Sequence, residues 1–247
     1  MPEDPSVMTA ATALPSLAPQ ESLSLILAGR LSLAWQPVRS AVGTPFFEEG
    51  LARLTLPCGA VAAAGDWVPA LEAAGLSAQL DRAALELALE RLGRERTLRL
   101  SVNLSAANLA DAPWHARLAR AAREDADAAR RLIVEITESA SPDLGRLALA
   151  RRAIAACGPA VALDDFGAGH ATEAVAMILR PDILKLDKRF ARDLRDGVAG
   201  AADRFAAALR KAIAAVDARR REAASSEPPP SALERLALLL QQPQREP

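Results

Sequence analysis

The sequence has few residues of the types that define several classes of protein. Tyrosine is absent, histidine occurs twice, and the only cysteines are Cys58 and Cys157. Two cysteines without metal-ligand spacing argue against a disulfide scaffold and favour a reducing compartment such as the cytoplasm. No apolar run approaches the roughly 18 residues of a membrane helix, and the N-terminus is acidic where a signal peptide is basic. We therefore expect a cytoplasmic chain with no membrane partner.

An excess of charge of either sign is also missing. The 30 basic and 31 acidic residues give a formal net charge of −1, which is unlike the strong positive field of most DNA- and RNA-binding proteins. We expect no DNA or RNA partner, so any nucleotide ligand must be bound by local groups. Hydrophobic residues make up 51% of the chain and charged residues 25%, which predicts a folded globular domain.

The composition divides the 247 residues into three parts. Residues 1–20 contain four prolines among small polar residues, which predicts a flexible leader. Residues 21–221 have the composition of a single α/β domain. Residues 222–247 are predicted to form a Pro-rich tail that carries one short helix.

Short apolar segments alternate with helical patterns along the central part. The predicted strands are Leu33 to Val38, Gly50 to Leu56, Leu98 to Leu104, Leu132 to Thr137, Ala160 to Leu163 and Ile183 to Leu186. The predicted helices include Leu80 to Leu92, Trp114 to Arg123, Leu144 to Cys157, Ala171 to Leu179 and a long one near 201–221. This alternation predicts a mostly parallel sheet, either in a barrel or doubly wound. Six strands are two fewer than a closed eight-stranded barrel requires.

Polar side chains lie at or near the carboxyl ends of several predicted strands. Asn103, Glu135 and the tandem Asp164-Asp165 occupy such places on three different strands. In a barrel these ends gather at one mouth, where active sites are built. Together with Glu49 they offer four carboxylates and one amide oxygen, which are ligands that Mg²⁺ or Mn²⁺ prefers. A pair of such ions can bind a phosphodiester and activate water.

The cation Lys185 follows the strand pattern Ile183-Leu184 and could assist proton transfer or neutralise a phosphate. Taken singly, an acid at a strand end more often caps a helix or faces solvent, and a lysine most often lies on the surface. The tandem aspartates are more specific, because the following Phe166-Gly167-Ala168-Gly169 suggests a tight loop that holds both carboxylates. The joint occurrence of these residues favours a metal site.

Six segments resemble, in the same order, the signature motifs of the EAL domain family: Trp35-Gln36-Pro37-Val38, Glu49-Gly50-Leu51-Ala52-Arg53, Ser101-Val102-Asn103-Leu104-Ser105, Glu135-Ile136-Thr137-Glu138-Ser139, Asp164-Asp165-Phe166-Gly167-Ala168-Gly169 and Leu184-Lys185-Leu186-Asp187. They cover roughly residues 33–190. The resemblance implies an α/β fold, a TIM-like (β/α) barrel of EAL type. It also implies cyclic di-GMP as partner and its hydrolysis to linear pGpG with Mg²⁺ or Mn²⁺ as cofactor.

The resemblance further implies roles for individual residues. Five of them match the family's metal ligands: Glu49, Asn103, Glu135, Asp164 and Asp165. Lys185 matches the lysine beside the nucleophilic water, and Arg53 matches an arginine that contacts a ligand phosphate. Gln36 and Leu51 match positions close to the ligand, and Glu138 matches a glutamate that steadies the loop after the tandem aspartates.

The chain also departs from the family pattern. Gly50 replaces the alanine of the name-giving motif. The family's later strand with an Ala-Glu-Gly-Val-Glu signature is not found, which leaves the barrel incomplete at its C-terminal end and one metal site short of a carboxylate. Two hypotheses stay open, a cyclic di-GMP phosphodiesterase and a catalytically impaired module that binds cyclic di-GMP or a protein. A homodimer or a regulatory protein partner is expected in either case.

Overall fold

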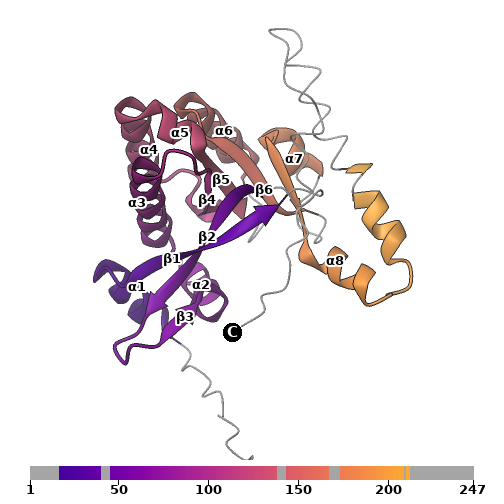
Figure 1. Ribbon diagram of the computed structural model, residues 1–247, viewed down its shortest axis with the longest axis horizontal. Coiled ribbons are helices and arrows are strands. Elements are labelled where there is room, and N and C mark those ends of the chain that lie inside the picture. Colours follow the sequence, from indigo (N-terminus) through magenta and orange to yellow (C-terminus); the bar gives the residue numbers. More distant parts are fainter. Residues whose placement is uncertain (1–16, 40–44, 138–142, 167–172, 209, 212–247) are drawn as a thin grey trace, which may run out of the picture.

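The computed structural model describes residues 17–39, 45–137, 143–166, 173–208 and 210–211 (Figure 1). Its strands are β1 (Leu31–Arg39), β2 (Pro45–Thr55), β3 (Val61–Ala63), β4 (Leu100–Ser105), β5 (Leu132–Thr137), β6 (Ala160–Phe166) and β7 (Ile183–Leu186). Its helices are α1 (Pro19–Leu27), α2 (Ala64–Ala73), α3 (Ala78–Arg94), α4 (Ala112–Glu124), α5 (Ala126–Arg131), α6 (Leu144–Cys157), α7 (Glu173–Leu179) and α8 (Lys188–Arg195). A 3-10 turn, η1 (Ala106–Asn108), follows β4, and residues 201–208 are helical.

One sheet in the order β1-β2-β4-β5-β6-β7 forms the centre of the molecule, with β3 beside β2. The strands β2, β4, β5, β6 and β7 run parallel, which confirms the predicted parallel sheet. The strands β1 and β3 run antiparallel to β2 and were not predicted to do so. Among the described strands, β1 pairs only with β2 and β7 only with β6, so this part of the sheet has two edges.

The predicted elements differ in how closely their bounds match. The strands β5 and β7 and the helix α6 have the predicted bounds, whereas β2 begins at Pro45 rather than Gly50. Near the N-terminus, Leu17 is buried and α1 begins at Pro19, so ordered structure starts inside the predicted leader. The predicted tail, 222–247, lies outside the described residues, as does the end of the long helix predicted near 201–221.

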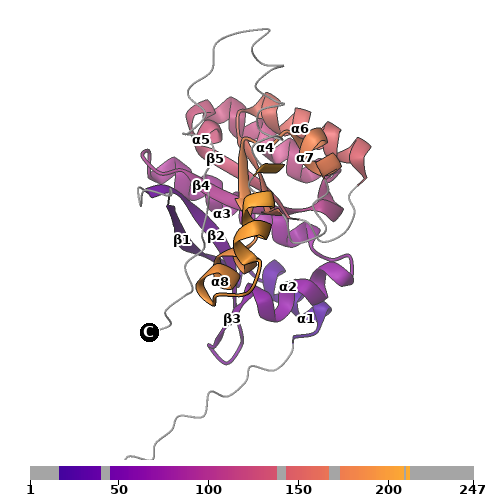
Figure 2. The same cartoon turned by 90° about the vertical axis from the view of Figure 1, so that its right-hand side faces the viewer.

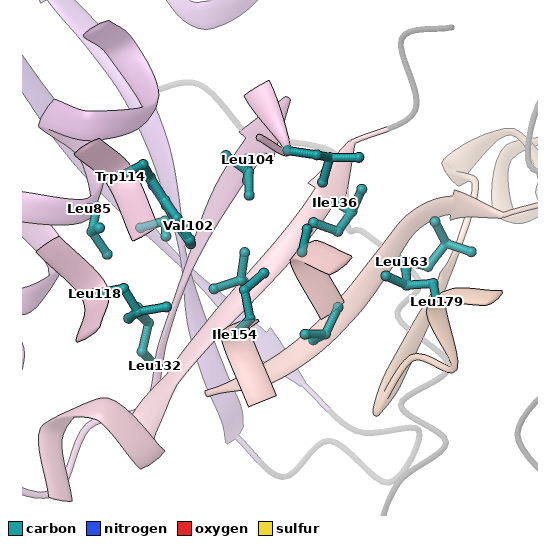
Figure 3. Close-up of a cluster of buried hydrophobic side chains, with 14 of the residues drawn as sticks. Leu85, Val102, Leu104, Trp114, Leu118, Leu132, Ile136, Ile154, Leu163 and Leu179 are labelled. Carbon is teal, nitrogen blue, oxygen red and sulfur yellow. The ribbon is translucent and has the colours of Figure 1, made fainter. Parts of the chain in front are cut away.

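The main core lies between the sheet and the helices α3, α4, α6 and α7 (Figures 1 and 2). Alternate residues of β4, β5 and β6 point to these helices, among them Val102, Ile136 and Leu163 (Figure 3). Leu85 and Trp114 close the cluster from the helix side and are fully buried. This packing fixes the outer face of each parallel strand and therefore sets the direction of the side chains on the inner face.

The inner face of the sheet carries two layers of side chains. The first layer is apolar and contains Phe47, Ile133, Ala162 and Ile183. The second layer lies two residues further along the same strands and contains Glu49, Glu135, Asp164 and Lys185. Because side chains alternate along a strand, residues two apart face the same side. The polar layer thus lies next to the buried apolar layer, in the direction of the carboxyl ends of the parallel strands.

Gly50 lies where β2 comes close to its neighbours. A Cβ atom at this position would lie 3.0 Å from the carbonyl oxygen of Ser101, 3.0 Å from Cζ3 of Trp35 and 3.2 Å from Cδ1 of Leu33. Trp35 is the cross-strand partner of Gly50, so its ring occupies the space that a larger residue would need. The glycine at this position of the motif is therefore matched to the tryptophan opposite.

Replacement of Gly50 with alanine is expected to lower the free energy of unfolding by about 1–3 kcal/mol, the usual range for overpacking. Urea denaturation measures this change. The Trp35→Phe substitution removes the ring atom nearest to the new methyl group, so it should recover part of the loss in the Gly50→Ala background. Strictly additive effects of the two substitutions would contradict the proposed match.

The buried carboxyl group of Asp81 links α3 to the end of β4 through hydrogen bonds. Oδ2 of Asp81 accepts hydrogen bonds from the backbone N–H of Ser105 (3.1 Å) and from Nδ2 of Asn108 (2.7 Å). Burial raises the pKa of Asp81 to about 7, and these hydrogen bonds offset only part of that rise. The folded protein therefore holds the protonated form of Asp81 more strongly than the unfolded chain does.

This shift gives a stability that depends on pH. Because the pKa of Asp81 is raised on folding, its contribution to stability is full below about pH 4 and is lost as the pH rises through about 7. Asp81→Asn cannot ionise, and its amide oxygen can still accept both hydrogen bonds. Between pH 4 and 8 the variant should gain up to about 4 kcal/mol relative to the wild type, at about 1.4 kcal/mol per pKa unit.

Chemical denaturation of both proteins across this pH range tests the expectation. The exposed Asp203 provides the matched control, Asp203→Asn, whose stability should follow that of the wild type. A constant difference between wild type and Asp81→Asn at every pH would contradict the assignment.

Candidate active site

A buried lysine lies at the centre of the polar layer. Nζ of Lys185, on β7, is 2.5 Å from Oε2 of Glu135 on β5. It is also 3.1 Å from Oε2 of Glu49 on β2 and 3.2 Å from Oδ2 of Asp164 on β6. Lys185, Glu135 and Glu49 are at most 3% exposed. Four strands thus bring one ammonium group and three carboxylates into direct contact.

The charges in this cluster act on one another because water is excluded. Burial, together with the negative charges of Glu49 and Asp164, raises the pKa of Glu135 to about 8, although Lys185 opposes the rise. Burial alone would lower the pKa of Lys185, but the carboxylates of Glu135, Asp164 and Glu49 outweigh it and raise that pKa above its usual range. Lys185 therefore stays protonated, and the cluster carries more negative than positive charge.

Asn103 and Glu135 are direct partners in the register between β4 and β5. Oδ1 of Asn103 and Oε1 of Glu135 are both buried without a hydrogen-bond partner among the described residues. Such unpaired acceptors are costly unless a cation or a donor satisfies them. One oxygen each from Glu49, Glu135 and Asp164 lie within 4.8 Å of one another. These oxygen donors fit a hard divalent ion such as Mg²⁺ or Mn²⁺.

The tandem aspartates lie in different surroundings. Asp164 joins the lysine cluster, whereas Asp165 is exposed and has a left-handed backbone conformation, with φ of 51°. The pairing of β6 with β7 is irregular at this place, between Leu163 and Phe166. Partial burial and the charges of Asp164 and Asp187 raise the pKa of Asp165 to about 6. The geometry thus separates Asp165 from the group of three carboxylates.

The residues predicted to contact a ligand lie on the first two strands. Gln36 is the cross-strand partner of Glu49, and Leu51 and Arg53 follow Glu49 at intervals of two residues along β2. These alternations place all three on the same face of the sheet as Glu49. Nη1 of Arg53 donates to the carbonyl oxygen of Ala52 at 3.0 Å. The predicted loop residue Glu138 lies outside the described residues.

One acidic residue near the site was given no role by the sequence analysis. Asp187 is buried at the start of α8, where its Oδ1 accepts a hydrogen bond from the backbone N–H of Arg189 at 2.6 Å. Its charge contributes to the raised pKa of Asp165. The sequence did contain a signal, because an aspartate that directly follows a strand and precedes a helix is a typical N-cap residue.

The sequence matches one known protein family over most of its length. The family model of the EAL domain covers residues 20–216. The chain belongs to the EAL domain family. This result confirms the resemblance inferred from the six motifs.

Two relatives of this EAL domain are bacterial proteins of greater length. The uncharacterised protein Rv1354c of Mycobacterium tuberculosis is 32% identical over 157 residues, which cover 59% of this chain and 25% of that protein. The cyclic di-GMP phosphodiesterase PdeF of Escherichia coli is 27% identical over 133 residues, which cover 52% of this chain and 18% of PdeF. The EAL domain described here thus matches a quarter or less of the length of each relative.

The fold agrees with solved EAL structures. The PaMucR phosphodiesterase in complex with c-di-GMP superposes with a TM-score of 0.65 and 25% identity, covering 75% of this chain and 81% of that one. This likeness supports the TIM-like α/β fold that the sequence predicted. No helix in the described part of the chain has the length and apolar character needed to cross a membrane.

Proposed function

We propose that this EAL domain hydrolyses cyclic di-GMP to linear pGpG with Mg²⁺ or Mn²⁺. The observation that carries the proposal is the cluster of Lys185 with Glu49, Glu135 and Asp164, which four strands bring together. PdeF is named a cyclic di-GMP phosphodiesterase, and PaMucR is a phosphodiesterase whose structure contains c-di-GMP. The likeness to both supports the same substrate for this chain.

The residues of the cluster have distinct tasks in this proposal. Glu49, Glu135 and Asp164, with Asn103, hold the metal ion through oxygen atoms, and Asp165 is the ligand assigned to a second ion. Such ions supply positive charge that stabilises the negative charge developing on a phosphodiester. Lys185 donates a hydrogen bond toward the attacking water or the phosphate and stays protonated because of its carboxylate neighbours.

The first two strands bind the nucleotide in this proposal. Arg53 contacts a phosphate, for which the fork of a guanidinium group is well suited. Gln36 offers an amide to the ligand, and Leu51 offers an apolar surface next to the metal ligand Glu49. All three lie on the inner face of β1 and β2, on the side of the acidic cluster. Glu138 is proposed to steady the loop that follows Asp165.

A second candidate function is a binding module without turnover, for cyclic di-GMP or a regulatory protein. The observation that favours it is the small number of clustered carboxylates. Among the described residues only Glu49, Glu135 and Asp164 form a group that could hold a metal ion, and Asp165 is exposed to solvent. A homodimer would be compatible with either function. Measured turnover separates the two candidates.

The test is to incubate the purified chain with cyclic di-GMP and Mg²⁺ or Mn²⁺ and to follow pGpG by chromatography. We expect product with the wild type and none with Asp164→Asn, because the substitution removes a carboxylate that contacts Lys185 and forms part of the metal group. A binding titration on the same samples accompanies the assay. Binding without product in the wild type would overturn the hydrolase and support the binding module.

A further inference from the structure

The three carboxylates of the proposed metal site, Glu49, Glu135 and Asp164, already contact a cation of the protein itself. Nζ of Lys185 contacts one oxygen of each of these three carboxylates, at 2.5–3.2 Å. All three distances are within hydrogen-bond range, and Lys185 is almost fully buried. With all three carboxyl groups ionised, as metal ligation requires, the three carboxylates and one ammonium give a formal charge of −2, where the carboxylates alone would carry −3. Lys185 thus neutralises part of a buried charge that would otherwise be strongly repulsive.

In the described part of the chain, two oxygens without partners belong to Glu135 and to its register partner Asn103. Oε2 of Glu135 binds Lys185, while Oε1 of Glu135 and Oδ1 of Asn103 are buried and unpaired among the described residues. A divalent ion that binds these two acceptors must share the carboxylate of Glu135 with the ammonium group. Two cations so close together repel each other strongly where water is excluded.

We propose that Lys185 is a resident counter-ion of the metal site, which stabilises the site without metal and weakens its affinity for the divalent ion. The inference rests on the proposed metal-dependent function, and it gives Lys185 a role in addition to catalysis. With the lysine in place, the acidic cluster folds before any ion is bound. The same charge makes the bound ion easier to release.

Substitution of Lys185 with methionine separates the charge from the volume of the side chain. The metal-free Lys185→Met protein should melt at a lower temperature than the wild type, because the buried carboxylates of Glu49 and Glu135 and the partly buried one of Asp164 lose their counter-ion. Its affinity for Mn²⁺ should rise by at least about tenfold, because the repulsion is removed and oxygen ligands become available. Isothermal titration calorimetry with MnCl₂ and thermal melts with and without Mn²⁺ measure both effects at one fixed pH.

The matched control is Lys188→Met. Lys188 is exposed at the start of α8, three residues after Lys185, and the ion pairs described for the three carboxylates do not include it. The charge of Lys188 acts on Asp165. The same substitution there should leave the metal-free melting temperature close to that of the wild type and should change the Mn²⁺ affinity by much less than about tenfold. An effect of equal size in the control would overturn the assignment to Lys185.

A double variant tests whether charge is the cause. Adding Glu49→Gln to Lys185→Met returns the formal charge of the cluster to −2, so the metal-free melting temperature should recover part of the loss. If Lys185→Met does not fold without metal, circular dichroism during a Mn²⁺ titration replaces the melt. Folding driven by Mn²⁺ would support the inference, and no folding at saturating Mn²⁺ would overturn it.

The outcomes distinguish the inference from the proposed function. Equal or weaker Mn²⁺ affinity in Lys185→Met than in the wild type overturns the inference and leaves the hydrolase standing. Mn²⁺ binding by Lys185→Met but not by the wild type supports the inference and contradicts metal-dependent hydrolysis by the wild type. Absence of Mn²⁺ binding in both proteins overturns both. Tighter binding together with lower metal-free stability is the expected result.

Discussion

Replacement of Glu135 with glutamine is expected to reduce the rate of pGpG formation by at least about 100-fold, since loss of outer-shell support alone costs roughly 10- to 100-fold. Glu135 is fully buried, and its two oxygens lie in different surroundings. Oε2 accepts a hydrogen bond from Lys185, whereas Oε1, like Oδ1 of Asn103, is buried without a hydrogen-bond partner among the described residues. Glutamine has nearly the same shape but has no charge, so it cannot balance Lys185 or bind an ion as strongly.

Steady-state kinetics of pGpG formation with Mn²⁺ measures this effect. The matched control is Glu124→Gln, an exposed glutamate at the end of the outer helix α4, which should leave the rate unchanged. Thermal melts of both variants separate lost chemistry from lost folding. A Glu135→Gln protein that is folded and within about threefold of the wild-type rate would contradict the central role given to this carboxylate.

The parts of the fold that could be predicted are those with continuous apolar runs. The strands β5 and β7 have the predicted bounds because their apolar runs are delimited on both sides. In contrast, β3 has three residues and α5 has six, and neither length gives a periodic pattern. The antiparallel direction of β1 follows from its pairing with β2, which alternation alone does not reveal.

The candidate site was predictable as a set of residues but not as a geometry. Motifs on different strands identified the carboxylates and Lys185, because parallel strands bring their carboxyl ends together. The sequence did not predict that Lys185 would contact three carboxylates at once. Nor did it predict that the tandem aspartates would face different surroundings, since this depends on the left-handed conformation of Asp165 and the irregular pairing of β6 with β7.

The largest stability effect is expected for Trp114, which anchors α4 in the main core. Its side chain is fully buried, and its backbone N–H donates to the N-cap residue Asp111 at 2.7 Å. Trp114→Ala should lower the free energy of unfolding by about 3–5 kcal/mol, the usual cost of removing a buried aromatic side chain. Urea denaturation followed by circular dichroism measures this loss.

The comparison with Trp114→Phe identifies the source of that stability. Nε1 of Trp114 is buried without a hydrogen-bond partner among the described residues, so phenylalanine keeps an aromatic ring and gives up no hydrogen bond of the indole. We expect Trp114→Phe to lower the free energy of unfolding by less than half as much as Trp114→Ala does. Leu149 on α6 is 66% exposed, and Leu149→Ala should change stability by no more than about 0.5 kcal/mol. Equal losses for Trp114→Phe and Trp114→Ala would show that the fit of the whole indole, rather than the burial of apolar area, holds α4 against the sheet and with it the strand β4 that carries Asn103.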